Sequence, residues 1–334
     1  MAASGPSLAD EIPIWDLNDL YSGPDDPKIK QDLDFVAEGT KTFADKYRGK
    51  LNDLDGAELG QSIKEYEDLS EVLSRVMSYA QLSFAAEAEN STIAAFYQNM
   101  NERATDISSI TLFFELELNR IADKTLATQM KDPGVTKYAP WIDAIRIFKP
   151  YQLEDNLEKL LHEKSVTGRS TWSRLFDETM AGMRFDVDGR KISSSETMSR
   201  MSDPDVSVRK KAAKAFGKRL DENIKLFSLI TNTLAKDKEI EDNWRKLPRP
   251  VTNCNLSNQV EDEVVDALAS AVKDNYENLA HRYYKLKAKW LGVEVMDYWD
   301  RNAPLPESDD AKIPWNEAKD TVLTSYNAFE PQLG

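Results

Sequence analysis

The chain contains two histidines, His162 and His281, and each follows a glutamate by four positions. Positions four apart lie on one face of a helix, so Glu158 and Glu277 would each share a face with a histidine. A peptidase helix of the HExxH type needs a second histidine four residues after the first, but Val166 stands at that position after His162. Di-iron carboxylate sites use a Glu-x-x-His spacing with further carboxylates. We therefore interpret both histidines as solvent-exposed or locally hydrogen-bonded, and a di-metal oxidase remains a minor alternative.

The segment Asp186-Val187-Asp188-Gly189 resembles the opening of a calcium-binding loop. Such a loop needs glycine at its sixth position and glutamate at its twelfth, and these positions hold Lys191 and Thr197. The Asp-Gly pair between short alternating runs instead predicts a β-hairpin turn.

Cys254 is the only cysteine, so the sequence excludes an internal disulfide and every multi-cysteine zinc arrangement. It could act as a nucleophile with His281 as its base, but neither residue lies in a known signature, and we interpret Cys254 as a small buried apolar residue. GxSxG, Walker and GxGxxG motifs are absent. We assign no catalytic residue and no metal ligand, and the substrate-binding residues stay unknown.

The formal net charge of −15 over 334 residues disfavours nucleic acid and anionic membranes as partners. The first residues have neither a basic region nor an apolar core, so they do not predict a secretory signal. No apolar stretch approaches the roughly 18 residues that a membrane span requires. These features predict a cytoplasmic protein with no nucleic-acid or membrane partner.

Apolar residues recur every three or four positions along most of the chain, which predicts an all-α fold with long helices. We expect Ser91 to cap one long helix that Asp132-Pro133-Gly134 ends, and Ser202 to cap a later one. The helix with the most regular apolar stripe should cover residues 259–291. The other expected helices span residues 28–51, 56–89, 137–148, 153–164, 170–181, 202–220, 221–245 and 314–329, and a hairpin lies within 183–193.

The change of period at the hairpin predicts a boundary between two units. Residues 1–27 form an extended arm, and its candidate anchors on a larger body are Ile12, Ile14, Trp15, Leu17, Leu20 and Tyr21. Residues 28–195 form a helical N-terminal domain. Residues 196–334 form the beginning of a second helical domain.

Four motifs, in the same order, resemble the oligoendopeptidase F-type zinc peptidases, relatives of thimet oligopeptidase. The resemblance covers the chain from about Ile12. The motifs are IPIWDLNDLYSGPDDP (12–27), RFDVDGRKIS (184–193), SRMSDPDVSVRKKAAKAF (199–216) and AHRYYKLKAKWLGVEVMDYWDRNAPLP (280–306).

The resemblance implies a complete protein that hydrolyses short peptides with a zinc ion held by an HExxH motif and a further glutamate. Those residues would lie beyond Gly334, so we carry none of them over, and we expect no cofactor in this chain and no activity without the missing catalytic half. The chain would be the N-terminal portion of the enzyme, truncated before HExxH. A complementary C-terminal half or self-association is the expected partner. The alternative is a non-catalytic helical scaffold that binds peptides or proteins.

Overall fold

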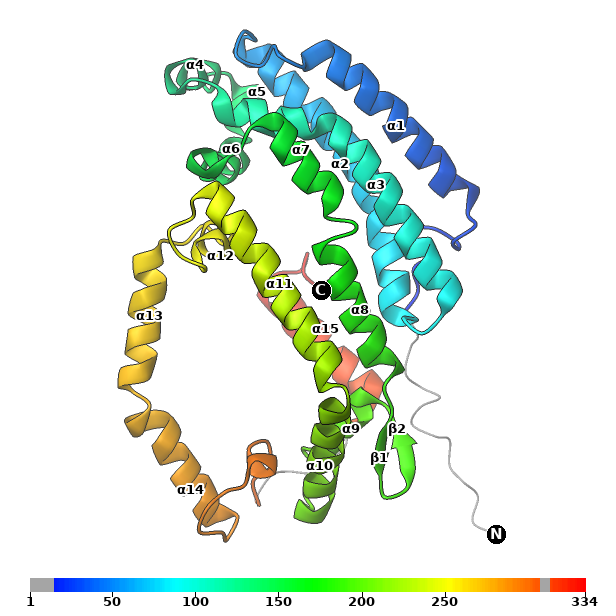
Figure 1. Ribbon diagram of the computed structural model, residues 1–334, viewed down its shortest axis with the longest axis vertical. Helices are drawn as coiled ribbons and strands as arrows, with labels where there is room; N and C mark the ends of the chain where they lie inside the picture. Colours follow the sequence, from blue (N-terminus) through cyan, green and yellow to red (C-terminus); the bar gives the residue numbers. More distant parts are fainter. Residues whose placement is uncertain (1–14, 307–312) are drawn as a thin grey trace.

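The computed structural model describes residues 15–306 and 313–334, and it confirms an all-α fold with one short β-hairpin (Figure 1). The expected anchors Ile12 and Ile14 lie outside the described residues. Within the described part of the arm, Tyr21 is buried and donates a hydrogen bond from its hydroxyl to Asp32 at 2.8 Å. Trp15 was also expected to anchor the arm, but it is 76% exposed.

Three long antiparallel helices form the main bundle: α1 (Pro27–Tyr47), α2 (Gly56–Ala86) and α3 (Ser91–Arg120). Asp55 caps α2 in a reciprocal capping box with Glu58, which satisfies two backbone N–H groups at its start. The cap of α3 is Asn90 rather than the expected Ser91, because the Asn90 side chain accepts hydrogen bonds from two N–H groups of the first turn.

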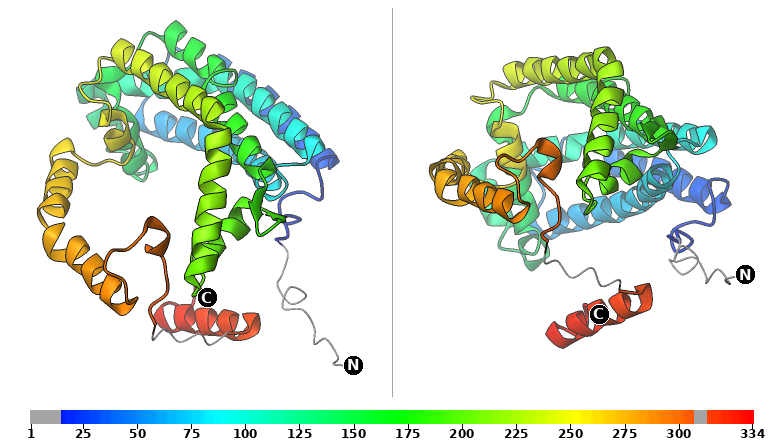
Figure 2. Two further views of the ribbon diagram at one scale, coloured as in Figure 1. Left: turned by 60° about the horizontal axis from the view of Figure 1, so that its bottom comes forward. Right: turned by 90° about the horizontal axis from the view of Figure 1, so that it is seen from below.

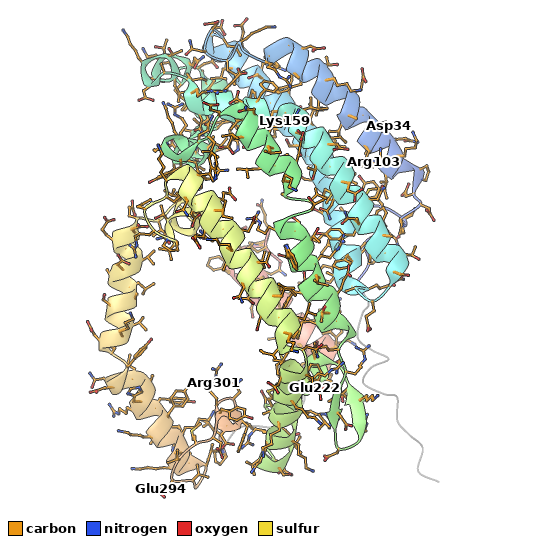
Figure 3. All side chains as sticks on the ribbon, viewed as in Figure 1. Asp34, Arg103, Lys159, Glu222, Glu294 and Arg301 are labelled. Atoms are coloured by element: carbon orange, nitrogen blue, oxygen red, sulfur yellow. The ribbon has the colours of Figure 1, made fainter. Side chains whose placement is uncertain are left out.

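Aromatic side chains fill the centre of this bundle. The rings of Phe43 on α1 and Phe114 on α3 have centroids 5.0 Å apart, and Tyr66 on α2 lies 4.9 Å from Phe114. Such pairs contribute about 0.5–1.5 kcal/mol each beyond the area they bury. Asp34 on α1 and Arg103 on α3 point toward one another, 3.7 Å apart, at the surface of the same three helices (Figure 3).

Short helices continue the bundle and correct one predicted boundary. Helix α3 ends at Arg120, and Asp132-Pro133-Gly134 does not terminate it. Asp132 instead caps α5, since its side chain accepts from the N–H of Gly134 and Pro133 opens the helix. The remaining elements here are α4 (Asp123–Gln129), α5 (Pro133–Thr136), α6 (Ala139–Arg146), η2 (Lys149–Tyr151), α7 (Asp155–Lys164) and α8 (Arg169–Gly182).

The predicted hairpin is confirmed. Strands β1 (Phe185–Val187) and β2 (Arg190–Ile192) pair antiparallel, with Phe185 opposite Ile192. Asp188 and Gly189 both have positive φ, 55° and 75°, as a two-residue turn that follows the twist of the strands requires. The Asp186 side chain accepts a hydrogen bond from the N–H of Gly189, so this segment serves as a turn.

Two long helices follow the hairpin and a short helix, α9 (Ser194–Arg200), that was not predicted. Asp205, not Ser202, caps α10 (Val206–Glu222), because its side chain accepts from the N–H of Ser207. Helix α11 (Ile224–Arg245) is followed by its C-cap, Lys246, which adopts the left-handed conformation with φ 57°.

The helix expected over residues 259–291 is not continuous. It is divided into α13 (Asp262–Asp274), a π-helical turn, η3 (Glu277–His281), and α14 (Arg282–Trp290). The N–H of His281 donates to the carbonyl of Tyr276, five residues earlier, which widens the turn and bends the segment (Figure 1). The last elements are α12 (Thr252–Ser257), before α13, and η4 (Tyr298–Asp300) and α15 (Trp315–Phe329), after α14.

Close backbone contact between α2 and α5 provides a test of the packing. A methyl group at Gly60 would lie 2.9 Å from the carbonyl carbon of Gly134 and 3.1 Å from its oxygen. We expect Gly60→Ala to lower the free energy of unfolding by about 1–3 kcal/mol, since backbone on both sides must move. Denaturant unfolding measures this change.

The control is Gly217→Ala in α10, where nothing lies within 4 Å. This substitution should stabilise the protein by about 0.5–1 kcal/mol. Equal effects would contradict the assigned contact.

Candidate functional site

The structure does not bring the two glutamate–histidine pairs together. His162 on α7 has its Nε2 atom 2.8 Å from the hydroxyl of Ser108, which joins α7 to α3. His281 is exposed on η3, with its ring 6.3 Å from that of Tyr276. Figure 1 shows α7 against the bundle and η3 at the far end of α13.

A zinc ion does not fit the side chains of this part of the protein. Zinc sites use three or four Cys, His or carboxylate ligands that converge on one point. Across residues 15–306 and 313–334, no group of three or more such residues could hold a metal ion. Of the nearest candidates, Glu158 is already bound by an arginine and His162 by a serine.

Cys254 was expected to be buried, and this prediction is wrong. The short helix α12 buries Thr252 and Asn255, which lie three positions apart on one face, so Cys254 faces the opposite side and is exposed. Helix α13, about 20 Å long at 1.5 Å per residue, separates α12 from His281. The proposed nucleophile and base therefore do not form a pair.

The apolar residues of the stripe predicted over residues 259–291 are exposed, although the π-helical turn divides the helix that carries them, and we call these residues together the strap face. Its eight residues are between 41% and 67% exposed, although most are large. They are Val264, Leu268, Val272, Tyr276, Leu279, Tyr283, Leu286 and Trp290. Helix α15 is similarly exposed and stands away from the bundle (Figure 2). Apolar area of this extent is typical of an interaction surface.

Ion pairs lie at both ends of the segment that carries the strap face. At its start, Arg249 makes two 2.8 Å hydrogen bonds to the carboxylate of Asp266 on α13. At its end, Arg209 on α10 contacts Asp300 at 2.6 Å, and both side chains are almost fully buried. Lys287 on α14 is buried beside them and donates to the carbonyl of Arg301. Burial and the charge of Arg209 lower the pKa of Lys287, against the opposing effect of Asp300.

A cleft of about 490 Å³ lies where α3, α6 and α7 meet α11. Its volume is in the range of small-molecule sites. Its walls combine apolar and acidic side chains. The lining residues are Leu112, Glu115, Leu116, Asn119, Trp141, Ala144, Ile145, Phe148, Tyr151, Gln152, Glu158, Glu241, Arg245, Leu247 and Asn253.

Arg245 organises one side of this cleft. Its guanidinium donates to both oxygens of Glu158 at 2.7 and 2.9 Å, and its Nε donates to Glu241 at 2.8 Å. Burial alone would raise the pKa of Glu158, but the hydrogen bonds from Arg245 and the N–H of Leu153, with the Arg245 charge, hold it below its ordinary value of 4.5. The pair joins α7 to α11 and so connects the bundle to the helices that carry the strap.

No sequence pattern identified this cleft. Its walls come from segments more than a hundred residues apart, and only the fold places them together.

Comparisons with known proteins find similarity to oligopeptidases. A family model described as Oligopeptidase F matches residues 117–185. Oligopeptidase PepF of Bacillus subtilis is 26% identical over 92% of this chain and 46% of its own length. An oligoendopeptidase F homolog of Borreliella burgdorferi is 23% identical over 94% of this chain and 52% of its own length. The chain therefore spans about half the length of these relatives.

Solved structures share the fold. Oligoendopeptidase-F from Enterococcus faecium superposes with a TM-score of 0.75 at 19% identity, covering 92% of this chain and 63% of that one. PZ peptidase A, solved with an inhibitor, gives 0.62 at 14% identity, covering 92% of this chain and 52% of that one. No helix of the described residues is long and apolar enough to cross a membrane.

The Arg245–Glu158 pair predicts a pH-dependent stability. Arg245→Met should lower the free energy of unfolding at pH 7 by about 3 kcal/mol, because it leaves a buried carboxylate without its partner. Since the folded pKa of Glu158 is lowered, the stabilisation is complete above pH 4.5 and is lost as the pH falls through the folded value. The difference between the two proteins, measured by denaturant unfolding at several pH values, should shrink in that direction.

The matched control is Arg120→Met, which breaks a similar two-bond pair with Asp155 between α3 and α7. Both of its side chains are about half exposed, so the expected cost is at most about 1 kcal/mol. Equal costs for the two variants would refute a special role for Arg245.

Proposed function

We propose that the chain is a member of the oligoendopeptidase F-type family and forms the N-terminal, helical part of an enzyme that hydrolyses oligopeptides. In this proposal the zinc ion and the catalytic residues are supplied by a C-terminal half. Across residues 15–306 and 313–334, no group of side chains could hold a metal ion. In this proposal, these residues bind and enclose the peptide.

The strap face is the observation that carries this proposal. Helices of 13 and 9 residues are marginal in water when isolated, because few hydrogen bonds offset the cost of nucleation. Burial of an apolar face normally supplies the rest of their stability, yet the strap face is exposed. A second body that covers it would complete the packing, as expected of a chain that spans half of its relatives' length.

We propose that the chain divides into two helical units near the hairpin. The match to the family model ends at residue 185, the first residue of β1. We retain residues 1–27, 28–195 and 196–334 as the arm, the N-terminal domain and the beginning of the peptidase domain.

A peptidase assay tests whether cleavage requires a separate C-terminal half. With zinc and a quenched fluorogenic peptide, the chain alone should give no cleavage above buffer. Adding the C-terminal half of the Bacillus subtilis relative, expressed separately, should give cleavage that a chelator abolishes. Chelator-sensitive cleavage by the chain alone would overturn the proposal. Peptide binding that needs no zinc, with no cleavage in any mixture, would favour a non-catalytic scaffold instead.

The strap face also predicts how the isolated chain behaves. We expect it to self-associate or to bind a hydrophobic dye, because its apolar area is open to water. Leu268→Gln with Leu279→Gln should reduce dye fluorescence several-fold. Ile240→Gln on α11, which alters an apolar residue that is 49% exposed outside the strap face, should change it little. Light scattering and dye titration measure both effects, and a dye-silent monomer would count against the missing partner.

A further inference from the structure

The helices after the hairpin are arranged as a ring. Helices α10, α11, α12, α13 and α14 follow one another around it, and η4 closes the ring by contacting α10 (Figure 1, Figure 2). We call residues 262–290, which carry the strap face, the strap segment. This segment is joined to the rest of the ring at its start, next to α12, and at its end, next to α10.

The strap segment has little packing along its length. All but one of residues 266–286 are exposed. At the start of the segment, Asn255 donates to Asp262 at 2.7 Å, and Arg249 pairs with Asp266. The side chains of that ion pair are 41% and 56% exposed, and exposed pairs contribute little stability. The position of the segment therefore depends mainly on the attachment at its other end.

Three charged side chains form the attachment at that end, and we call them the clasp. They are Arg209 on α10, Lys287 on α14 and Asp300 on η4, each at most 4% exposed. Arg209 contacts Asp300 at 2.6 Å, and Lys287 donates at 2.7 Å to the backbone carbonyl of the residue after Asp300. Beside the clasp, the ammonium of Lys210 lies 5.0 Å from the centre of the Trp299 ring.

The clasp contains two cations and only one carboxylate. Burial and the charge of Arg209 both disfavour the ammonium form of Lys287, whereas Asp300 favours it. Taking charges out of water is costly, so a buried ion pair adds little net stability although its geometry is specific. An attachment of this kind therefore holds one defined position when it is closed and needs little free energy to open.

We propose that the clasp is a reversible latch, and that the strap segment opens as one unit when the contact between Arg209 and Asp300 breaks. The segment then turns about its start at α12, where exposed polar contacts hold it. Opening of the clasp opens the ring. One consequence rests on the proposed function: the open ring admits the C-terminal half, or a peptide, between α11 and α14.

Hydrogen exchange of the full chain, followed by mass spectrometry, tests the latch. Asp300→Asn keeps the size of the side chain and a hydrogen-bond acceptor but removes the charge. It should therefore speed the exchange of amides in α13 and α14 by about tenfold or more. Exchange in α1, α2 and α3 should stay the same. Unchanged exchange in α13 and α14, or equal acceleration in the bundle, would overturn the proposal.

The matched control is Asp266→Asn, which removes the same charge from the exposed pair at the start of the strap segment. Exchange in α13 and α14 should rise by about threefold at most, because water replaces an exposed partner at little cost. If the two variants had equal effects, the clasp would not be the attachment that controls the segment.

Lys287→Met distinguishes a charged latch from a structural contact. Methionine keeps an apolar stem and removes the cation that opposes Arg209, so it should slow exchange in α13 and α14 by about threefold. In the Asp300→Asn protein, where two cations remain, Lys287→Met should restore most of the lost protection. Faster exchange in both backgrounds would show that Lys287 acts through its hydrogen bond, and the role given to its charge would be wrong.

A binding experiment separates this inference from the proposed function. Biolayer interferometry measures how fast the C-terminal half of the Bacillus subtilis relative associates with the chain, and Asp300→Asn should raise that rate about threefold by increasing the open population. Absence of binding to either protein would count against the proposed function and leave the exchange result intact. Equal rates, with faster exchange in the variant, would refute the role of opening in access.

Discussion

An amphipathic helix is stable in water only when its apolar face is covered. The helices of the bundle meet this requirement among themselves, whereas α13 and α14 do not. In the bundle of α1, α2 and α3 the helices cover one another, and residues such as Leu33, Leu59 and Phe114 are almost fully buried. Along α13 and α14 the apolar residues are as large but remain exposed. The bundle is therefore a self-sufficient body, whereas the strap is a surface whose stability depends on something that packs against it.

Arginines link the two regions. Arg245 fixes α11 to α7, Arg249 fixes the start of α13, and Arg209 fixes the end of the strap to α10. Charged pairs of this kind contribute little net stability when compared with apolar packing, but their geometry is specific. These ion pairs hold the segment that carries the strap face at both of its ends, and the apolar residues between them stay accessible to a partner.

Much of the fold was predictable because it is local. The period of apolar residues in α2 and the Asp188-Gly189 turn depend only on neighbours in the chain. The failures involve contacts that the sequence does not display. The sequence predicts a helix end at Asp132, but its side chain caps the start of α5. It also predicts a buried Cys254, because it does not reveal that α12 buries the face of Thr252 and Asn255. The sequence does not predict the cleft for the same reason, since Asn119 and Arg245 line one cavity only after folding.

The π-helical turn at Glu277–His281 affects how the strap can be recognised. A turn with one additional residue rotates everything after it by about 100° relative to an unbroken α-helix. The aliphatic residues of α13 and the aromatic residues of α14 thus present themselves along different directions. A single straight rod could follow only one of them, so the complementary surface must itself be bent or assembled from two elements.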